Sequence, residues 1–250
     1  IESPGTPLYV LGAITCKVTC FVSSNDSLKE DFISDPEKYI YVFRMVLLLL
    51  TTVALYILGD VVQKVSQSSI TAILFQLAPF LSVDIMLTST IVTPDHLLVL
   101  LMLLYLAVLF NYIHKENNTE DIKSAFYFSL FTAIGLATKI TFLPLAIFPL
   151  FILPRTKQKG IYILSTGLLI PLFAFTAAMQ YDRFFGWVKG LIFHAGTYGT
   201  GEEKIISGTS FISNFGKIMS TELPFICICC LLIICVCLFV IKKKTTHQNK

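Results

Sequence analysis

Long apolar runs separated by short polar segments dominate the hydrophobic pattern of the chain. A transmembrane helix needs roughly 20 apolar residues, and fewer where neighbouring helices shield its ends. Clear candidates for spans are residues 40–61, 70–90, 97–113, 161–180 and 223–241. The pattern therefore predicts an all-α fold, a polytopic bundle of transmembrane helices that forms a single domain over residues 1–250.

One further apolar stretch, residues 124–153, is too long for a single straight span. It contains Lys139 and two prolines, and a proline inside a helix removes a backbone hydrogen bond and kinks or ends the helix. We therefore expect two short helices, about 124–138 and 141–153, with a turn near Lys139.

The first apolar stretch, residues 6–22, is short and contains Lys17. We expect an interfacial helix there, with a weak span as the alternative. With this segment and the two short helices, the pattern predicts about six to seven spans. Because the chain starts abruptly at Ile1, we also expect the numbering to begin inside a larger protein.

The charges of the connecting segments predict an orientation, because Lys and Arg accumulate in cytoplasmic loops. The basic tail 242–250 is then cytoplasmic, on the same side as the loops 63–69, 114–123 and 154–160. The opposite, lumenal or periplasmic side receives the acidic segment 23–38, the turns at Asp95 and Lys139, and the polar loop 181–222. The expected order is an outer segment 1–39, core spans 40–180, the loop 181–222, a last span 223–241 and the tail.

Composition supports a membrane protein. The chain is 55% hydrophobic and only 14% charged, with a mean hydropathy of +0.75, whereas about a quarter of the residues of a soluble domain are charged. The net charge of +3 is too small to indicate a nucleic-acid partner. We expect an integral, multi-pass protein of the bacterial inner membrane or the endoplasmic reticulum membrane, surrounded by membrane lipids.

The seven cysteines indicate neither a disulfide framework nor a metal site. Five of them lie inside the apolar run 223–241, where cysteine behaves as a small hydrophobic residue. Cys16 and Cys20 are four residues apart on an expected helix and could at most form one pairing or redox site, so packing is the simpler interpretation. The sequence predicts no cofactor and leaves a requirement for a divalent metal open.

Asp95 is the first candidate for a functional residue, because it follows Pro94 at the start of an apolar helix. The structural interpretation is a good helix start, since proline fits the first helical position and an acid interacts favourably with the helix dipole. The functional interpretation is a partly desolvated carboxylate at the outer membrane surface that acts as a base or binds a cation.

Two further charged residues lie in apolar surroundings. Either the side chain of Lys139 extends so that its ammonium group lies at the membrane surface, or the ammonium group binds an anionic lipid phosphate. Asp84 lies about two turns before the outer end of its run, so it either pairs with Arg44 or Lys139 or faces an aqueous cavity.

The loop FHAGTYGTGEEK, residues 193–204, is rich in glycine. Glycines at such spacing let backbone N–H groups approach an anion, but the pattern is no nucleotide-binding fingerprint and a surface role is the simpler interpretation for its side chains. The candidate residues of this loop are His194, Gly196, Tyr198, Gly199 and Gly201.

Five segments, in this order, resemble the membrane glycosyltransferases of the GT-C class. The similarity is greatest to dolichyl-phosphate-mannose protein mannosyltransferase-like enzymes (glycosyltransferase family 39), with the lipid A aminoarabinose transferases as cousins. The common order of the segments carries more weight than any one motif. The segments are SPGTPLYVLGA (3–13), YVFRMVLLLLTTVALYILGDVV (41–62), TSTIVTPDHLLVLLMLLYLAVL (88–109), GLATKITFLPLAIFPLFILP (135–154) and FHAGTYGTG (193–201).

The resemblance implies sugar transfer from a polyprenyl- or dolichyl-phosphate carrier on the lumenal or periplasmic face. It implies that Asp95 binds hydroxyl groups of acceptor or donor, that Lys139, with Arg44 or Arg183, binds the donor phosphate, and that His194 and Tyr198 close a loop over the site. The family's acidic residue in the first outer loop would lie before Ile1, and Ser3 stands where His is usual.

Two other classes of function remain open from the sequence. A multi-pass transporter or lipid flippase would also contain broken helices and intramembrane charges, although no second half of the chain repeats the proline-interrupted pair. A catalytically incomplete, scaffold-like GT-C protein is the third class, because the first-loop acid is not in this sequence.

Overall fold

The computed structural model of the chain describes residues 5–23, 27–114, 122–175, 186, 189, 208–223, 226–227 and 230. Over these residues the chain forms helices and turns without a strand, so the predicted all-α class is confirmed.

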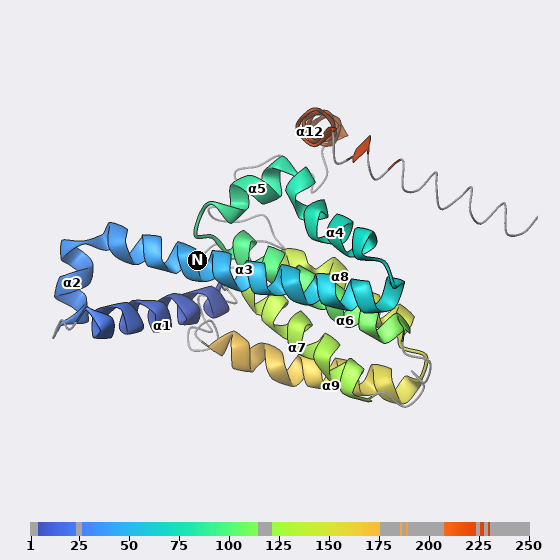
Figure 1. The fold of residues 1–250 in the computed structure, drawn as a ribbon. Helices are drawn as coiled ribbons and strands as arrows, with labels where there is room; N and C mark the ends of the chain where they lie inside the picture. Colours follow the sequence, from blue (N-terminus) through green and yellow to red (C-terminus); the bar gives the residue numbers. More distant parts are fainter. Residues whose placement is uncertain are drawn as a thin grey trace, which may run out of the picture.

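The N-terminal part is a helical hairpin with a short helix across its tip (Figure 1). It consists of α1 (Thr6–Val22), α2 (Leu28–Ser34) and α3 (Pro36–Ser66). Side chains of Ser27 and Asp35 accept hydrogen bonds from the first turns of α2 and α3, which satisfies backbone N–H groups at the turn. The 31 residues of α3 span about 46 Å at 1.5 Å per residue, so this helix is longer than the hydrocarbon core of a bilayer.

The predicted span 70–90 is not one straight helix. The structure divides it into α4 (Ser69–Leu77), the 3₁₀ helix η1 (Ala78–Leu81) and α5 (Val83–Ser89), with a bend of 82°. The break has a local cause, since Ser82 adopts extended backbone and caps α5 through its hydroxyl oxygen. Pro79, three residues earlier, has no backbone N–H to continue the helical hydrogen bonds.

The remaining described helices form the body of the bundle. They are α6 (Pro94–His114), α7 (Ile122–Thr138), η3 (Ile140–Phe142), α8 (Leu143–Ile152), α9 (Thr156–Phe173) and α12 (Gly208–Thr221). The predicted pair of short helices with a turn at Lys139 is confirmed, because Lys139 has extended backbone between α7 and η3. Within the expected polar loop 181–222, the structure shows the helix α12.

Aromatic side chains pack the centre of the bundle around α6. α6 lies between α3 and α7, and α7 packs in turn on α9. Tyr105 is fully buried, with its ring against Phe128 and Phe142, and its hydroxyl donates a hydrogen bond of 2.9 Å to the carbonyl of Leu145. This buried contact joins α6 to α8 and leaves no polar atom of the tyrosine unsatisfied.

The helices alternate in direction, which gives the bundle two ends. One end, here called the Asp95 end, contains the start of α6 and the turn at Lys139. The other, the His114 end, contains the C-termini of α3 and α6 and the first turn of α9. Of the functional candidates in the described part, Asp84, Asp95 and Lys139 lie at the Asp95 end.

The expected six to seven spans are not supported in the described part of the chain. Only α3 and α6 are long and apolar enough to cross a membrane, and a third span is counted if the bent pair Ser69–Leu81 and Val83–Ser89 is taken as one. α1, α7 and η3–α8 are apolar but too short, and the first turn of α9 carries polar residues. The expected last span, 223–241, lies almost wholly outside the described residues.

Candidate functional site

An ion pair between Asp95 and Lys139 forms the centre of the site. The Lys139 Nζ lies 2.7 Å from Asp95 Oδ1, although the residues are 44 positions apart in the sequence. Asp95 belongs to the first turn of α6, and Lys139 forms the turn between α7 and η3. Their side chains are 47% and 34% exposed. The pair is therefore accessible to a bound molecule and is not sealed in the core.

Packing of Phe142 on Gly135 shapes the turn that carries Lys139. The Lys139 N–H donates to the Gly135 carbonyl at 2.9 Å, and the Phe142 N–H donates to the Lys139 carbonyl at 3.1 Å. A Cβ at Gly135 would lie 2.4 Å from the Phe142 ring, so only glycine allows the ring to approach the helix this closely. These contacts direct the Lys139 side chain toward α6.

His96 anchors the start of α6 to α3. The ring is fully buried, with Nδ1 3.3 Å from the Ile91 carbonyl and Nε2 3.2 Å from Thr51 Oγ1. A carbonyl only accepts, so the neutral ring donates from Nδ1. Its Nε2 accepts from the Thr51 hydroxyl, which shares its single proton with the Leu47 carbonyl at 2.9 Å. His96 holds the first turn of α6 in place and thereby positions Asp95. No role for His96 was predicted from the sequence.

A cavity of about 330 Å³ is lined by Asp95 of the ion pair, whereas Lys139 is not among its lining residues. Asp84 and Asp95 contribute carboxylates to its wall, while most of the lining is apolar. The sequence left three possibilities for Asp84, which were pairing with Arg44, pairing with Lys139 or facing a cavity. The structure supports the third, because Asp84 lines the cavity and Lys139 pairs with Asp95. The lining residues from α5, α6, η3 and α8 include Thr88, Leu98, Val99, Met102, Phe142 and Leu145.

The start of α1 reaches the same end of the bundle. The Gly5 N–H donates a hydrogen bond of 3.2 Å to the carbonyl of Thr138, the residue before Lys139. Gly5 has a φ of 49°, in the left-handed region that favours glycine. The segment around Gly5 and the segment around Lys139 are thus neighbours in space.

Glu222 supports the helix that carries Asp84. Its Oε1 accepts a hydrogen bond of 2.9 Å from the Asp84 N–H, across 138 positions of the sequence. The residue is 7% exposed, and its Oε2 is buried without a hydrogen-bond partner among the described residues. Because Glu222 directly follows α12 in the chain, this hydrogen bond connects the C-terminal segment to the cavity wall. No local signal in the sequence predicted it.

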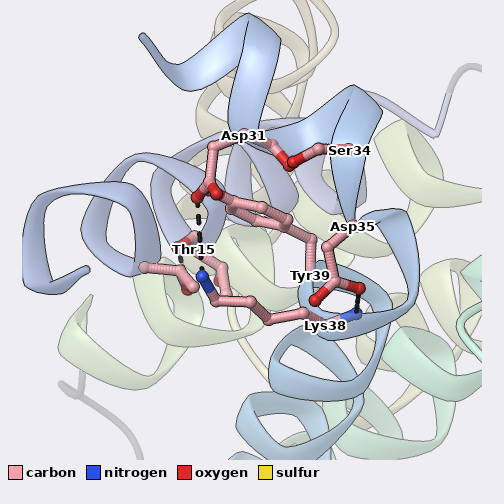
Figure 2. Close-up of polar contacts among 7 residues, drawn as sticks. Thr15, Asp31, Ser34, Asp35, Lys38 and Tyr39 are labelled. Atoms are coloured by element: carbon pink, nitrogen blue, oxygen red, sulfur yellow. Dashed lines mark hydrogen bonds and ion pairs between the residues drawn. The ribbon is translucent and has the colours of Figure 1, made fainter. Parts of the chain in front are cut away.

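A second polar cluster joins α1, α2 and α3 at the tip of the hairpin (Figure 2). The Asp31 carboxylate accepts a hydrogen bond from the hydroxyl of buried Tyr39 and lies 3.5 Å from the Lys38 ammonium. The Lys38 ammonium also lies over the Tyr39 ring, 5.5 Å from its centroid. The cluster contributes no residue to the cavity wall, and its contacts are those expected of groups that stabilise a tight helical turn.

Arg44 is not part of the cavity lining. It lies on α3, seven residues from Thr51 toward the tip of the hairpin, which is about 10 Å along the helix. Its Nε is buried without a hydrogen-bond partner among the described residues. The role of Arg44 in binding a phosphate therefore stays a prediction, and the structure does not place the residue at the ion pair.

The other predicted site residues lie outside the described part of the chain. They are Arg183 and the glycine-rich loop residues His194, Gly196, Tyr198, Gly199 and Gly201.

Metal ligands do not gather in the described part of the chain. Over those residues, no group of three or more His, Cys, Asp or Glu side chains is placed to hold a metal ion. The cysteines described there, Cys16 and Cys20 among them, form no disulfide bond in that part of the chain. What the described site offers is one cation, two carboxylates and an apolar cavity wall.

No protein-family model, curated protein or solved structure matches this chain. A lysine ammonium can bind a phosphate, a carboxylate can bind hydroxyl groups or accept a proton, and an apolar cavity can receive a lipid chain.

Proposed function

We propose that the protein is a membrane glycosyltransferase, a hexosyl- or pentosyltransferase that moves a sugar from a polyprenyl- or dolichyl-phosphate donor to a protein, lipid or glycan acceptor. The observation that carries the proposal is the Asp95–Lys139 ion pair beside a largely apolar cavity. A lipid-linked donor combines an anionic phosphate with an apolar chain, and this site combines a cation with an apolar wall.

In the proposed reaction, Lys139 binds the donor phosphate and stabilises the charge that develops as the bond between phosphate oxygen and sugar breaks. The acceptor hydroxyl attacks the anomeric carbon, and the phosphate leaves on its lipid carrier. Asp95 binds the reacting hydroxyl and accepts its proton. Because the two side chains pair in the structure, the donor phosphate competes with Asp95 for Lys139 and thereby frees the carboxylate.

The proposed orientation places the Asp95 end on the lumenal or periplasmic side of a multi-pass protein. Three predicted cytoplasmic loops, 63–69, 114–123 and 154–160, connect helices at the opposite, His114 end. The basic tail is cytoplasmic in this arrangement, and either the endoplasmic reticulum or the bacterial inner membrane fits it.

The positions of three segments that resemble GT-C enzymes also support a GT-C-like protein. The segments 3–13, 88–109 and 135–154 are separate in the sequence. Their residues Gly5, Asp95 and Lys139 lie at the same end of the bundle. If these segments form one site, this would explain why they occur in the same order as in the GT-C enzymes that they resemble.

The experiment is transfer of a labelled sugar from a polyprenyl-phosphate donor by the full chain in proteoliposomes. We expect Asp95→Asn to lower the rate of transfer at least 100-fold, the usual minimum contribution of a general base. We expect Lys139→Gln to raise the donor KM and to lower kcat. Asp60→Asn and Lys64→Gln are matched controls. Asp60 and Lys64 form an exposed ion pair with an N–O distance of 2.6 Å, and neither residue lines the cavity. Unchanged transfer by both site variants would overturn the proposal.

A transporter or lipid flippase is the second candidate, and a specific observation favours it. The pair α4–α5 is bent by 82°, and Asp84 lies on the cavity wall just after the break. Transporters form binding sites at such interrupted helices. Movement of a labelled lipid-linked sugar across sealed vesicles, without release of the sugar, would favour this class. If the wild-type chain showed neither movement of the lipid-linked sugar nor transfer of the sugar, a non-catalytic GT-C-like protein would be favoured.

A further inference from the structure

A second cavity, of about 380 Å³, lies between α3, α6 and α7. Its wall is apolar over most of its length, with Ile57 and Val61 from α3, Leu104 and Val108 from α6, and Phe131 from α7. We call this cavity the three-helix groove. Its volume falls in the range of sites that bind small molecules.

The polar residues of the groove gather at one end. Asn111 is close to the C-terminus of α6, and Lys123 and Tyr127 belong to the first turns of α7. The Lys123 side chain is exposed, and it forms no ion pair with a residue that the structure describes. Among the described residues that line it, the groove is therefore apolar along the helices and has one charged residue, Lys123, at the His114 end.

We infer that the three-helix groove binds an anionic phospholipid of the cytoplasmic leaflet, with an acyl chain along the groove and the phosphate against Lys123. The apolar wall fits an acyl chain, and the Lys123 ammonium is complementary to an anionic headgroup. Asn111 and Tyr127 supply hydrogen-bonding groups beside it. Basic pockets between membrane helices on the cytoplasmic side bind anionic lipid headgroups for this reason.

This lipid site is separate from the candidate active site. Asn111 follows Asp95 by 16 residues on the same helix, α6, which corresponds to about 24 Å along its axis. One headgroup cannot contact Lys123 and Lys139 together. The inference therefore does not rest on the proposed sugar transfer, and it requires that the bundle lies in a membrane with its His114 end on the cytoplasmic side.

The test is photo-crosslinking of the full chain in phosphatidylcholine nanodiscs. Each sample contains a trace of phosphatidylglycerol or of phosphatidylcholine with a diazirine on one acyl chain, and labelled peptides are mapped by mass spectrometry. We expect phosphatidylglycerol to label the peptides that contain Leu104–Asn111 and Lys123–Phe131 several-fold more than phosphatidylcholine does. One basic residue near an anionic headgroup contributes about 1 kcal/mol, so Lys123→Gln is expected to reduce this labelling about fivefold.

Two further variants make the result specific. Lys157→Gln removes an exposed lysine from the first turn of α9, on the same expected side of the membrane, and is expected to leave labelling unchanged. Val108→Phe fills the groove and is expected to lower labelling by both lipids. Equal labelling of the wild-type groove by the two lipids would overturn the inference. An equal effect of Lys123→Gln and Lys157→Gln would also overturn it.

Discussion

Lys64 and Lys139 each pair with an aspartate at nearly the same distance, but their surroundings differ. The Lys64–Asp60 pair joins two residues that are one helical turn apart on the surface of α3. Surface pairs of this kind contribute less than about 1 kcal/mol to stability. The Lys139–Asp95 pair joins two elements beside a cavity with apolar walls. At the residue scale, the environment of the pair, and not its geometry, makes it a candidate for chemistry.

The contact between Gly135 and Phe142 leads to a prediction about stability. In Gly135→Ala the added methyl group overlaps the Phe142 ring, so the turn at Lys139 must shift, and overpacking of this kind costs about 1–3 kcal/mol. We expect a lower melting temperature in detergent. Gly167→Ala is the control, since nothing lies within 4 Å of the added Cβ on α9. Equal melting temperatures of wild type and Gly135→Ala would contradict the packing described for this turn.

At the element scale, short breaks decide how the apolar segments are used. Extended backbone at Ser82 and at Lys139 interrupts two apolar stretches, and both breaks lie near the cavity. α6 is uninterrupted, and its first turn is held by contacts to α3. Rigid helices with breaks at one end give the site its walls and bring its charged residues together.

The contact between α3 and α6 provides a test at this scale. Thr51→Val removes the hydroxyl that lies 3.2 Å from His96 Nε2 and leaves that buried nitrogen without a partner, at a cost of about 1–3 kcal/mol. Thermal unfolding in detergent should detect the loss. Thr52→Val is the matched control, because its exposed hydroxyl donates only to the Leu48 carbonyl one turn earlier. Similar melting temperatures of the two variants would show that His96 does not anchor α6.

At the scale of the whole molecule, the two ends of the bundle have different chemistry. The Asp95 end holds the ion pair, the cavity with two carboxylates and the buried contact of Glu222 with α5. The His114 end holds the basic connecting segments 63–69 and 154–160 and the polar end of the three-helix groove. A membrane protein with this asymmetry presents its proposed reaction site and its proposed lipid site to opposite leaflets.

Thiol labelling from one side of the membrane tests this arrangement. In a variant without native cysteines, Glu37→Cys near the start of α3 and Lys157→Cys in the first turn of α9 both place a thiol at an exposed position. We expect a membrane-impermeant maleimide added to the lumenal or periplasmic side to label the first thiol and to reach the second only after the membrane is opened. Labelling of both from one side would exclude the proposed orientation.

Much of the site could be named from the sequence, but its contacts could not. Asp95 and Lys139 were recognisable individually, because charged residues beside apolar runs are unusual. Their pairing was not predicted, and the cavity was one of three alternatives for Asp84. His96 and Glu222 had no distinguishing local pattern. Each acts through a partner 45 or 138 positions away.

The sequence by itself determined the helices and their class, because apolar run length and helix start signals act within a few residues. The runs 40–61 and 97–113 lie inside α3 and α6, and the turn at Lys139 has its expected place. Only the tertiary structure decided how the run 70–90 bends and which side chains meet at the Asp95 end. The physical reason is that such contacts depend on how helices pack in three dimensions, which the order of apolar and polar residues along one helix does not specify.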